Sequence, residues 1–126
     1  MLSRYLNPEF GPLILRLSLG LTMLLAHGVP KLVNFTTNST SFPDPLGVSP
    51  KLSLLLTIFA EVVCSIFLIL GLKVRITLIP LIFTMLVASF IVHAGQAWSN
   101  QEPAFIFLTG YIAIMFTGPG KFSLTK

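Results

Sequence analysis

Apart from Arg16, five ionisable side chains of this chain fall inside or at the ends of otherwise apolar stretches, and their types could do chemistry. They are His27, Lys31, Glu61, His93 and Glu102. An ionisable group in apolar surroundings is costly, so it needs either a partner or a purpose such as a ligand site or a proton path. Imidazole and carboxyl groups are the side chains that most often transfer protons in proteins. We therefore expect these residues to form one polar pocket or proton relay.

The spacing of the polar residues predicts one narrow polar stripe on each helix. Arg16 and His27 are eleven residues apart, which returns a helix to nearly the same face, and Lys31 follows His27 by four residues. The other stripes are Thr57, Glu61 and Ser65, then Ser89, His93 and Gln96, and finally Glu102 and Thr109. We expect the stripes to face one another, with Arg16 as an anchor near one boundary. The remaining structural polar groups are expected to be Thr57, Ser65, Ser89 and Gln96.

Other interpretations of the same residues stay open. Glu61 and Lys31 can form a structural ion pair that only fixes the register of the helices. A further alternative is a metal or haem site that uses His27, Glu61 and His93. The single cysteine, Cys64, allows no internal disulfide and no cysteine-based metal site.

Four apolar stretches must position these side chains, at about residues 11–33, 52–72, 76–98 and 103–118. A helix needs about 20 apolar residues to cross a bilayer, so the first three are long enough and the fourth is short. The polar segment 34–50 joins the first two stretches as an outer loop, and the other connections are a few residues long. The pattern predicts an all-α fold, a single integral membrane domain over residues 1–126 built as an antiparallel four-helix bundle.

Composition and charge agree with this interpretation. Hydrophobic residues make up 54% of the 126 residues and charged residues only 10%, against about 25% charged in soluble domains. A soluble enzyme and a disordered tail are excluded, and without a run of positive charge no nucleic-acid partner is expected. Most basic residues fall at the end shared by both termini and the second connection, namely Arg4, Lys73, Arg75, Lys121 and Lys126. Both termini are therefore expected to be cytoplasmic.

In order along the chain, several short motifs resemble those of the DoxX family of small four-helix bacterial membrane proteins. They are Arg16-Leu17, His27-Gly28, Lys31-Leu32, Ala60-Glu61-Val62, Leu70-Gly71-Leu72, Val92-His93, Glu102 and Gly118-Pro119-Gly120. The long first loop, with the triplets Asn34-Phe35-Thr36 and Asn38-Ser39-Thr40, departs from the family pattern.

The resemblance implies a multi-pass protein of the bacterial plasma (inner) membrane that serves as a subunit of a redox system. The family takes its name from a subunit of a thiosulfate:quinone oxidoreductase, so quinone is the implied ligand of the polar pocket. The sequence has no flavin or nicotinamide fingerprint, so electrons would have to come from a partner protein. A non-enzymatic scaffold that docks a soluble partner, a haem-binding or metal-binding bundle, a transporter and a homo-oligomer remain alternatives.

Overall fold

A computed structural model describes residues 6–125, and in this range the chain is helical and contains no strand. The first helical stretch consists of α1 (Phe10–Met23), η2 (Leu24–Gly28) and α2 (Val29–Val33), and a short helix, α3 (Phe35–Asn38), follows it. The second stretch consists of α4 (Pro50–Ile58), η3 (Phe59–Cys64) and α5 (Ser65–Leu70). The third consists of α6 (Val74–Val87) and η4 (Ala88–Val92), and α7 (Trp98–Thr117) is the fourth. The prediction of an all-α chain is confirmed.

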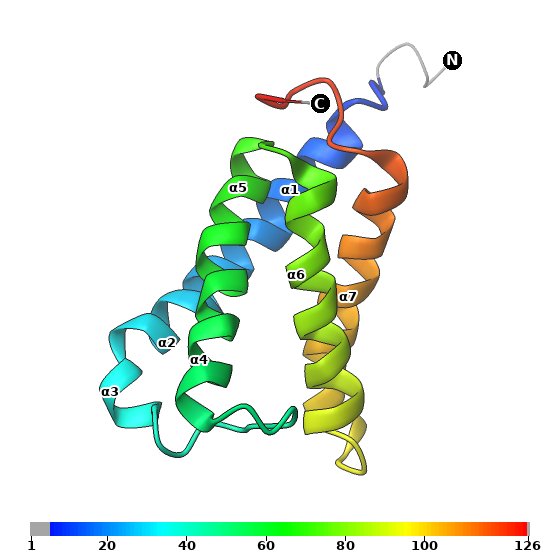
Figure 1. Ribbon diagram of the computed structural model, residues 1–126. Coiled ribbons are helices and arrows are strands. Elements are labelled where there is room, and N and C mark those ends of the chain that lie inside the picture. Colours follow the sequence, from blue (N-terminus) through cyan, green and yellow to red (C-terminus); the bar gives the residue numbers. More distant parts are fainter. Residues whose placement is uncertain (1–5, 126) are drawn as a thin grey trace.

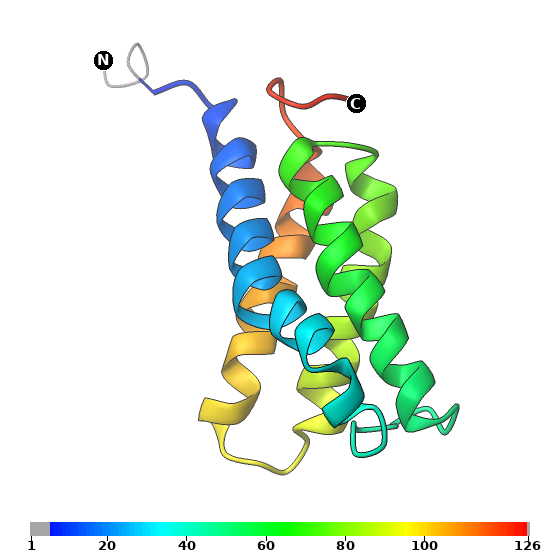
Figure 2. The same ribbon diagram turned by 90° about the vertical axis from the view of Figure 1, so that its left-hand side faces the viewer.

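The long stretches run alternately up and down (Figures 1 and 2). Helix α1 packs against α5 and α7, and α6 packs against α5 and α7. The beginning of α1, the turn between α5 and α6 and the segment after α7 lie at one end, which is the upper end in Figure 1. The long loop before α4 and the connection between α6 and α7 lie at the opposite end, which we call the loop end.

Three of the stretches are long and apolar enough to cross a membrane, namely Phe10–Val33, Pro50–Leu70 and Val74–Val92. Helix α7 has 20 residues but is not among them, because its first turn reads Trp-Ser-Asn-Gln-Glu. Large apolar side chains are also exposed on the outside of all these helices; Ile76 is 68% exposed and Phe116 is 83% exposed. Apolar side chains over so much of the surface are what a lipid environment favours and water does not.

Two of the expected helix boundaries are wrong. The third stretch ends at Val92 and not near Trp98, and α7 begins at Trp98, before the expected start at Pro103. His93 caps the stretch in a non-helical conformation, and Gly95, with a left-handed φ of +77°, prevents a right-handed helix from resuming before Trp98. A left-handed glycine also ends α5, where the amides of Gly71 and Leu72 donate to the carbonyls of Leu68 and Phe67 in a Schellman motif.

Arg16 is buried, with 1% of its surface exposed, and its guanidinium joins three parts of the chain. Its nitrogens donate to the carbonyls of Leu68 (3.0 Å) and Ile69 (3.2 Å) in the last turn of α5. They also donate to the carbonyls of Pro119 (2.7 Å) and Phe122 (2.9 Å) in the segment after α7. The carbonyl of Leu68 also accepts from the amide of Gly71, whereas those of Ile69, Pro119 and Phe122 have no backbone donor among residues 6–125, so the cation supplies the missing hydrogen bonds.

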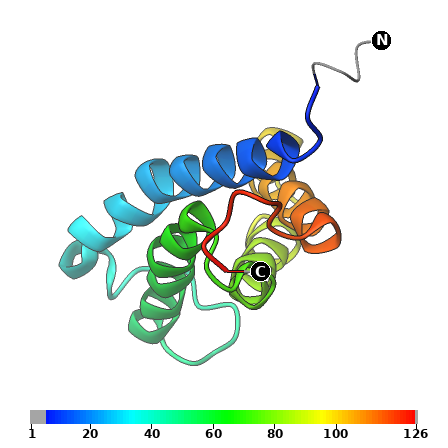
Figure 3. The same ribbon diagram turned by 90° about the horizontal axis from the view of Figure 1, so that it is seen from above.

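The segment after α7 closes this end of the molecule (Figure 3). The amides of Leu124 and Thr125 donate to the carbonyls of Leu70 and Gly71, at 3.3 Å and 3.0 Å. The amide of Lys121 donates to the carboxylate of Glu9 at 2.5 Å. The C-terminal segment is therefore attached both to the start of the first stretch and to the end of the second.

We predict that Arg16→Met lowers the free energy of unfolding by about 3 kcal/mol or more. The substitution leaves buried carbonyls without the guanidinium donor, and each hydrogen bond to a charged group contributes about 1.5–3 kcal/mol. Denaturant titration in mixed micelles measures the loss. Arg75→Met is the matched control, since Arg75 is exposed and donates to the single carbonyl of Met115 (3.0 Å). Equal losses in the two variants would contradict the role given to Arg16.

Candidate functional site

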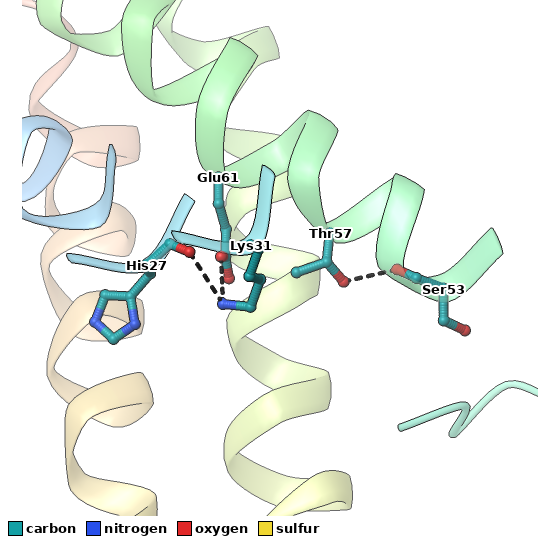
Figure 4. A network of polar contacts seen from close by, with 5 residues as sticks. All are labelled: His27, Lys31, Ser53, Thr57 and Glu61. Atoms are coloured by element: carbon teal, nitrogen blue, oxygen red, sulfur yellow. Dashed lines mark hydrogen bonds and ion pairs between the residues drawn. The ribbon is translucent and has the colours of Figure 1, made fainter. Parts of the chain in front are cut away.

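An ion pair between Lys31 and Glu61 lies at the centre of the candidate site (Figure 4). Lys31 Nζ is 2.6 Å from Glu61 Oε1, and the two side chains are 25% and 5% exposed. Lys31 Nζ also lies 3.5 Å from the carbonyl oxygen of His27. The pair joins α2 to η3, so it links the first helical stretch to the second through the buried carboxylate of Glu61.

The site residues lie in or beside turns with π-helical hydrogen bonding. His27 is in η2, Glu61 is in η3 and Ser89 is in η4, and His93 directly follows the end of η4 at Val92. In η4, for example, the amide of His93 donates to the carbonyl of Ala88, five residues earlier, at 3.0 Å. Such turns insert one residue into a helix and occur frequently at functional sites. Three of the stretches therefore change their helical phase near the site.

Gly28 lets the first two stretches approach at the ion pair. A Cβ atom added to Gly28 would lie 2.7 Å from the carbonyl oxygen of Glu61, closer than real contacts allow. The obstructing atom is backbone and cannot turn aside, so any larger residue would move the two stretches apart. The glycine therefore sets the short distance over which Lys31 reaches Glu61.

A cavity of about 270 Å³ adjoins the ion pair. It lies between α4 and the η4 end of the third stretch, where the two stretches separate toward the loop end (Figure 1). The polar residues that line it are Lys31, Ser53, Thr57, Glu61, Thr84 and His93. Leu56 and Phe83 line it too and are 52% and 53% exposed, so the cavity reaches the apolar outer surface of the molecule.

The outer loop forms a wall of this cavity. Its lining residues are Phe42, Pro43, Pro45, Leu46 and Val48. Asp44 holds the loop in place, because its carboxylate accepts hydrogen bonds from the amides of Val48 and Ser49 and from the hydroxyl of Ser53 (2.8 Å). Sequence analysis predicted a polar surface loop here and missed both Asp44 and the apolar lining. The only signal was the set of apolar residues within a polar segment.

Two of the expected pocket residues lie elsewhere. The ring of His27 points away from the ion pair (Figure 4) and packs edge-on against Phe107 of α7, with ring centroids 5.6 Å apart. His27 lies within the π-helical turn η2, where the residues depart from the 3.6-residue spacing on which the expected face was based. Glu102 is exposed in the first turns of α7 and does not line the cavity.

His93 lines the cavity, whereas Gln96 does not share a helical face with it as expected, since the helix ends before both. Gln96 is exposed in the connection to α7, and its Oε1 lies 3.2 Å from His93 Nδ1. The carbonyl of His93 accepts a hydrogen bond from Gln101 at 2.9 Å. These contacts hold the imidazole at the edge of the cavity.

The described residues contain no group of three or more His, Cys, Asp or Glu side chains that could hold a metal ion. His27, Glu61 and His93, the alternative metal ligands, do not form such a group in the structure, and the ring of His27 packs against Phe107 instead.

The other polar residues lie in different places. Thr57 lines the cavity, and Ser65 and Ser89 are fully buried. The hydroxyls of Ser65, Ser89 and Tyr111 have no hydrogen-bond partner among residues 6–125. Tyr111 is a buried polar group that sequence analysis missed, since an aromatic residue in an apolar helix gives no polar signal.

The apolar helical stretches and the charges paired between them define a helical membrane protein. The family model named DoxX matches residues 11–94, and the chain belongs to this family. The match includes the first three helical stretches and ends before α7. Searches of the curated proteins and of the solved structures found no match.

We predict strong coupling between Lys31 and Glu61 in a double-mutant cycle. Lys31→Met leaves a buried carboxylate without its cation, a change that typically costs about 3–5 kcal/mol, and adding Glu61→Gln should recover part of that loss. The cycle is measured by unfolding in mixed micelles and should give a coupling energy above about 1 kcal/mol. Lys51→Met with Glu102→Gln is the control, because both residues are exposed at the loop end. Additive losses at Lys31 and Glu61 would contradict the pairing.

Proposed function

We propose that this protein is a membrane subunit of a redox system and that its cavity binds a quinone head group. The cavity carries the proposal: it has mainly apolar walls, a few polar groups and a rim at the apolar outer surface. Ligand sites in proteins have this composition, and the volume is close to the lower end of their range of about 300–1,000 Å³. Such a cavity fits a ring, while an isoprenoid tail can leave past Leu56 and Phe83 into lipid.

Lys31 and His93 are the residues that would hold the ring. The Lys31 ammonium can donate to a carbonyl oxygen of the ring, and the His93 imidazole can accept a hydrogen bond from a hydroxyl group of the ring once the ring is reduced. Glu61 can accept and release a proton beside Lys31. A bound quinone supplies a carrier for two electrons and two protons, and we propose that a partner protein delivers the electrons.

A second candidate function is a non-enzymatic membrane scaffold that docks a soluble redox or oxidative-stress protein. The Lys31–Glu61 ion pair favours it, because a pair already satisfied within the protein can serve only to fix the helices. The two candidates differ in one property, which is whether the cavity binds a ligand.

We predict that the purified protein in lipid nanodiscs binds a short-chain ubiquinone analogue and that Lys31→Met weakens this binding about tenfold or more. Loss of a hydrogen bond from a charged donor costs about 1.5–3 kcal/mol, and each 1.4 kcal/mol is tenfold in affinity. Lys51→Met, outside the cavity, should leave the affinity unchanged. Calorimetric titration measures the dissociation constants. Binding that is absent, or equal in all variants, would favour the scaffold.

We further infer that the helical stretches form a multi-pass, antiparallel four-helix bundle in a bacterial plasma (inner) membrane, and that the whole chain is one domain. The end with the C-terminal segment carries Lys73, Arg75 and Lys121, which supports a cytoplasmic location for it. Arg4 and Lys126, which contribute to the same charge bias, lie outside the described residues. The cavity then opens in the outer half of the bilayer.

We predict that a cysteine at position 40, in the outer loop, reacts with a membrane-impermeant maleimide in intact spheroplasts. The chain for this test carries Cys64→Ala with Thr40→Cys, and Thr40 is exposed. Cys64→Ala with Lys121→Cys should react only after the membrane is broken, since Lys121 lies at the opposite end. Labelling in the reverse order would overturn the proposed orientation.

A further inference from the structure

We propose that the cavity binds the reduced, dihydroxy form of the ring more tightly than the quinone, and this inference depends on the proposed function. The hydrogen-bonding groups that line the cavity are mostly acceptors. A quinone presents two carbonyl oxygens that only accept, whereas a hydroquinone presents two hydroxyl groups that donate. The form that the site favours therefore follows from the number of donors and acceptors it leaves free.

Among the described residues, Lys31 is the only cationic donor of the lining, and two of its three N–H groups are directed to protein atoms. One faces Glu61 Oε1 at 2.6 Å and one faces the carbonyl of His27 at 3.5 Å. A single N–H group is left for a ligand. The hydroxyl of Ser53 is not available as a donor either, because it donates to Asp44 at 2.8 Å.

Thr57 and Thr84 offer acceptors. The hydroxyl of Thr57 donates to the carbonyl of Ser53, and that of Thr84 donates to the carbonyl of Pro80, both at 2.8 Å. Each hydroxyl has one proton, so a threonine that donates to its own helix leaves only oxygen lone pairs for a ligand.

His93 offers an acceptor for a reason that involves its neighbour. Gln96 Nε2 donates to the carbonyl of Val92 at 3.3 Å, which directs the amide oxygen of Gln96 toward His93. That oxygen lies 3.2 Å from Nδ1, so Nδ1 is the nitrogen that donates. In the neutral ring the other nitrogen, Nε2, then carries a lone pair.

Glu61 adds a further acceptor, because Oε1 binds Lys31 while Oε2 has no hydrogen bond from residues 6–125. The free groups of the lining are thus one N–H of Lys31 and five acceptors, on Ser53, Thr57, Glu61, Thr84 and His93. One carbonyl of a quinone can be satisfied here and the other cannot. A hydroquinone satisfies both of its hydroxyl protons, and one of its oxygens can accept from Lys31.

The test compares three probes of nearly equal shape by anaerobic calorimetric titration in nanodiscs: decyl-ubiquinone, its hydroquinone and the O,O-dimethyl ether of that hydroquinone. We expect the hydroquinone to bind at least tenfold more tightly than the quinone, and the ether, which has no O–H donor, to lose that advantage. A site built to bind hydroxyl groups discriminates against analogues that lack them. A tenfold preference raises the midpoint potential of the bound two-electron couple by about 30 mV.

Thr57→Val and Thr84→Val should each reduce the preference several-fold while the quinone affinity stays nearly unchanged. Thr109→Val is the matched control, because Thr109 also donates to a carbonyl of its own helix (Phe105, 2.9 Å) but is exposed outside the cavity. If none of the probes binds, the proposed function fails and this inference with it. If quinone binds as tightly as hydroquinone, or if the threonine variants keep the full preference, the quinone site stands and this inference is overturned.

Discussion

The ion pair between Lys31 and Glu61 is the contact on which the rest of the site depends. Neither charge can be left without a partner among apolar side chains, so the pair fixes how the first two helical stretches approach one another. Gly28 makes the short distance possible, because no side chain separates its backbone from that of Glu61. The pair also forms the polar wall of the cavity. The same two residues therefore hold the first two helical stretches together and supply polar groups to the cavity.

Arg16 applies the same constraint at the opposite end of the molecule. Its guanidinium has no carboxylate partner among residues 6–125 and is satisfied instead by carbonyls at the end of α5 and in the C-terminal segment. Two polar cross-links thus fasten the first stretch to the second, one at each end of their contact. The side of α4 that faces η4 takes no part in these cross-links. The two elements can therefore lie apart, with a cavity between them, while the first and second stretches stay attached.

Helical phase was sufficient to predict the interior positions of Arg16, Lys31 and Glu61, since a charge within an apolar run must turn toward other polar groups. It was not sufficient for His27, because a π-helical turn depends on packing and leaves no mark in the residue pattern. Nor was it sufficient for Gln96, since the helix ends at Val92, before the expected face reaches Gln96. The wall contributed by the outer loop could not be predicted, because it depends on hydrogen bonds of Asp44 that form only in the folded chain.

The acceptor-rich character of the cavity follows from the apolar surroundings themselves. A hydroxyl inside a helix can donate its proton to the carbonyl four residues earlier in the same helix. Thr57 and Thr84 both make this bond, so their oxygens face the cavity without a proton to give. Donors then have to come from side chains that carry several protons, and in this lining only Lys31 has one to spare. The hydrogen bonds that Thr57 and Thr84 make within their own helices therefore also determine that a ligand must supply the donors.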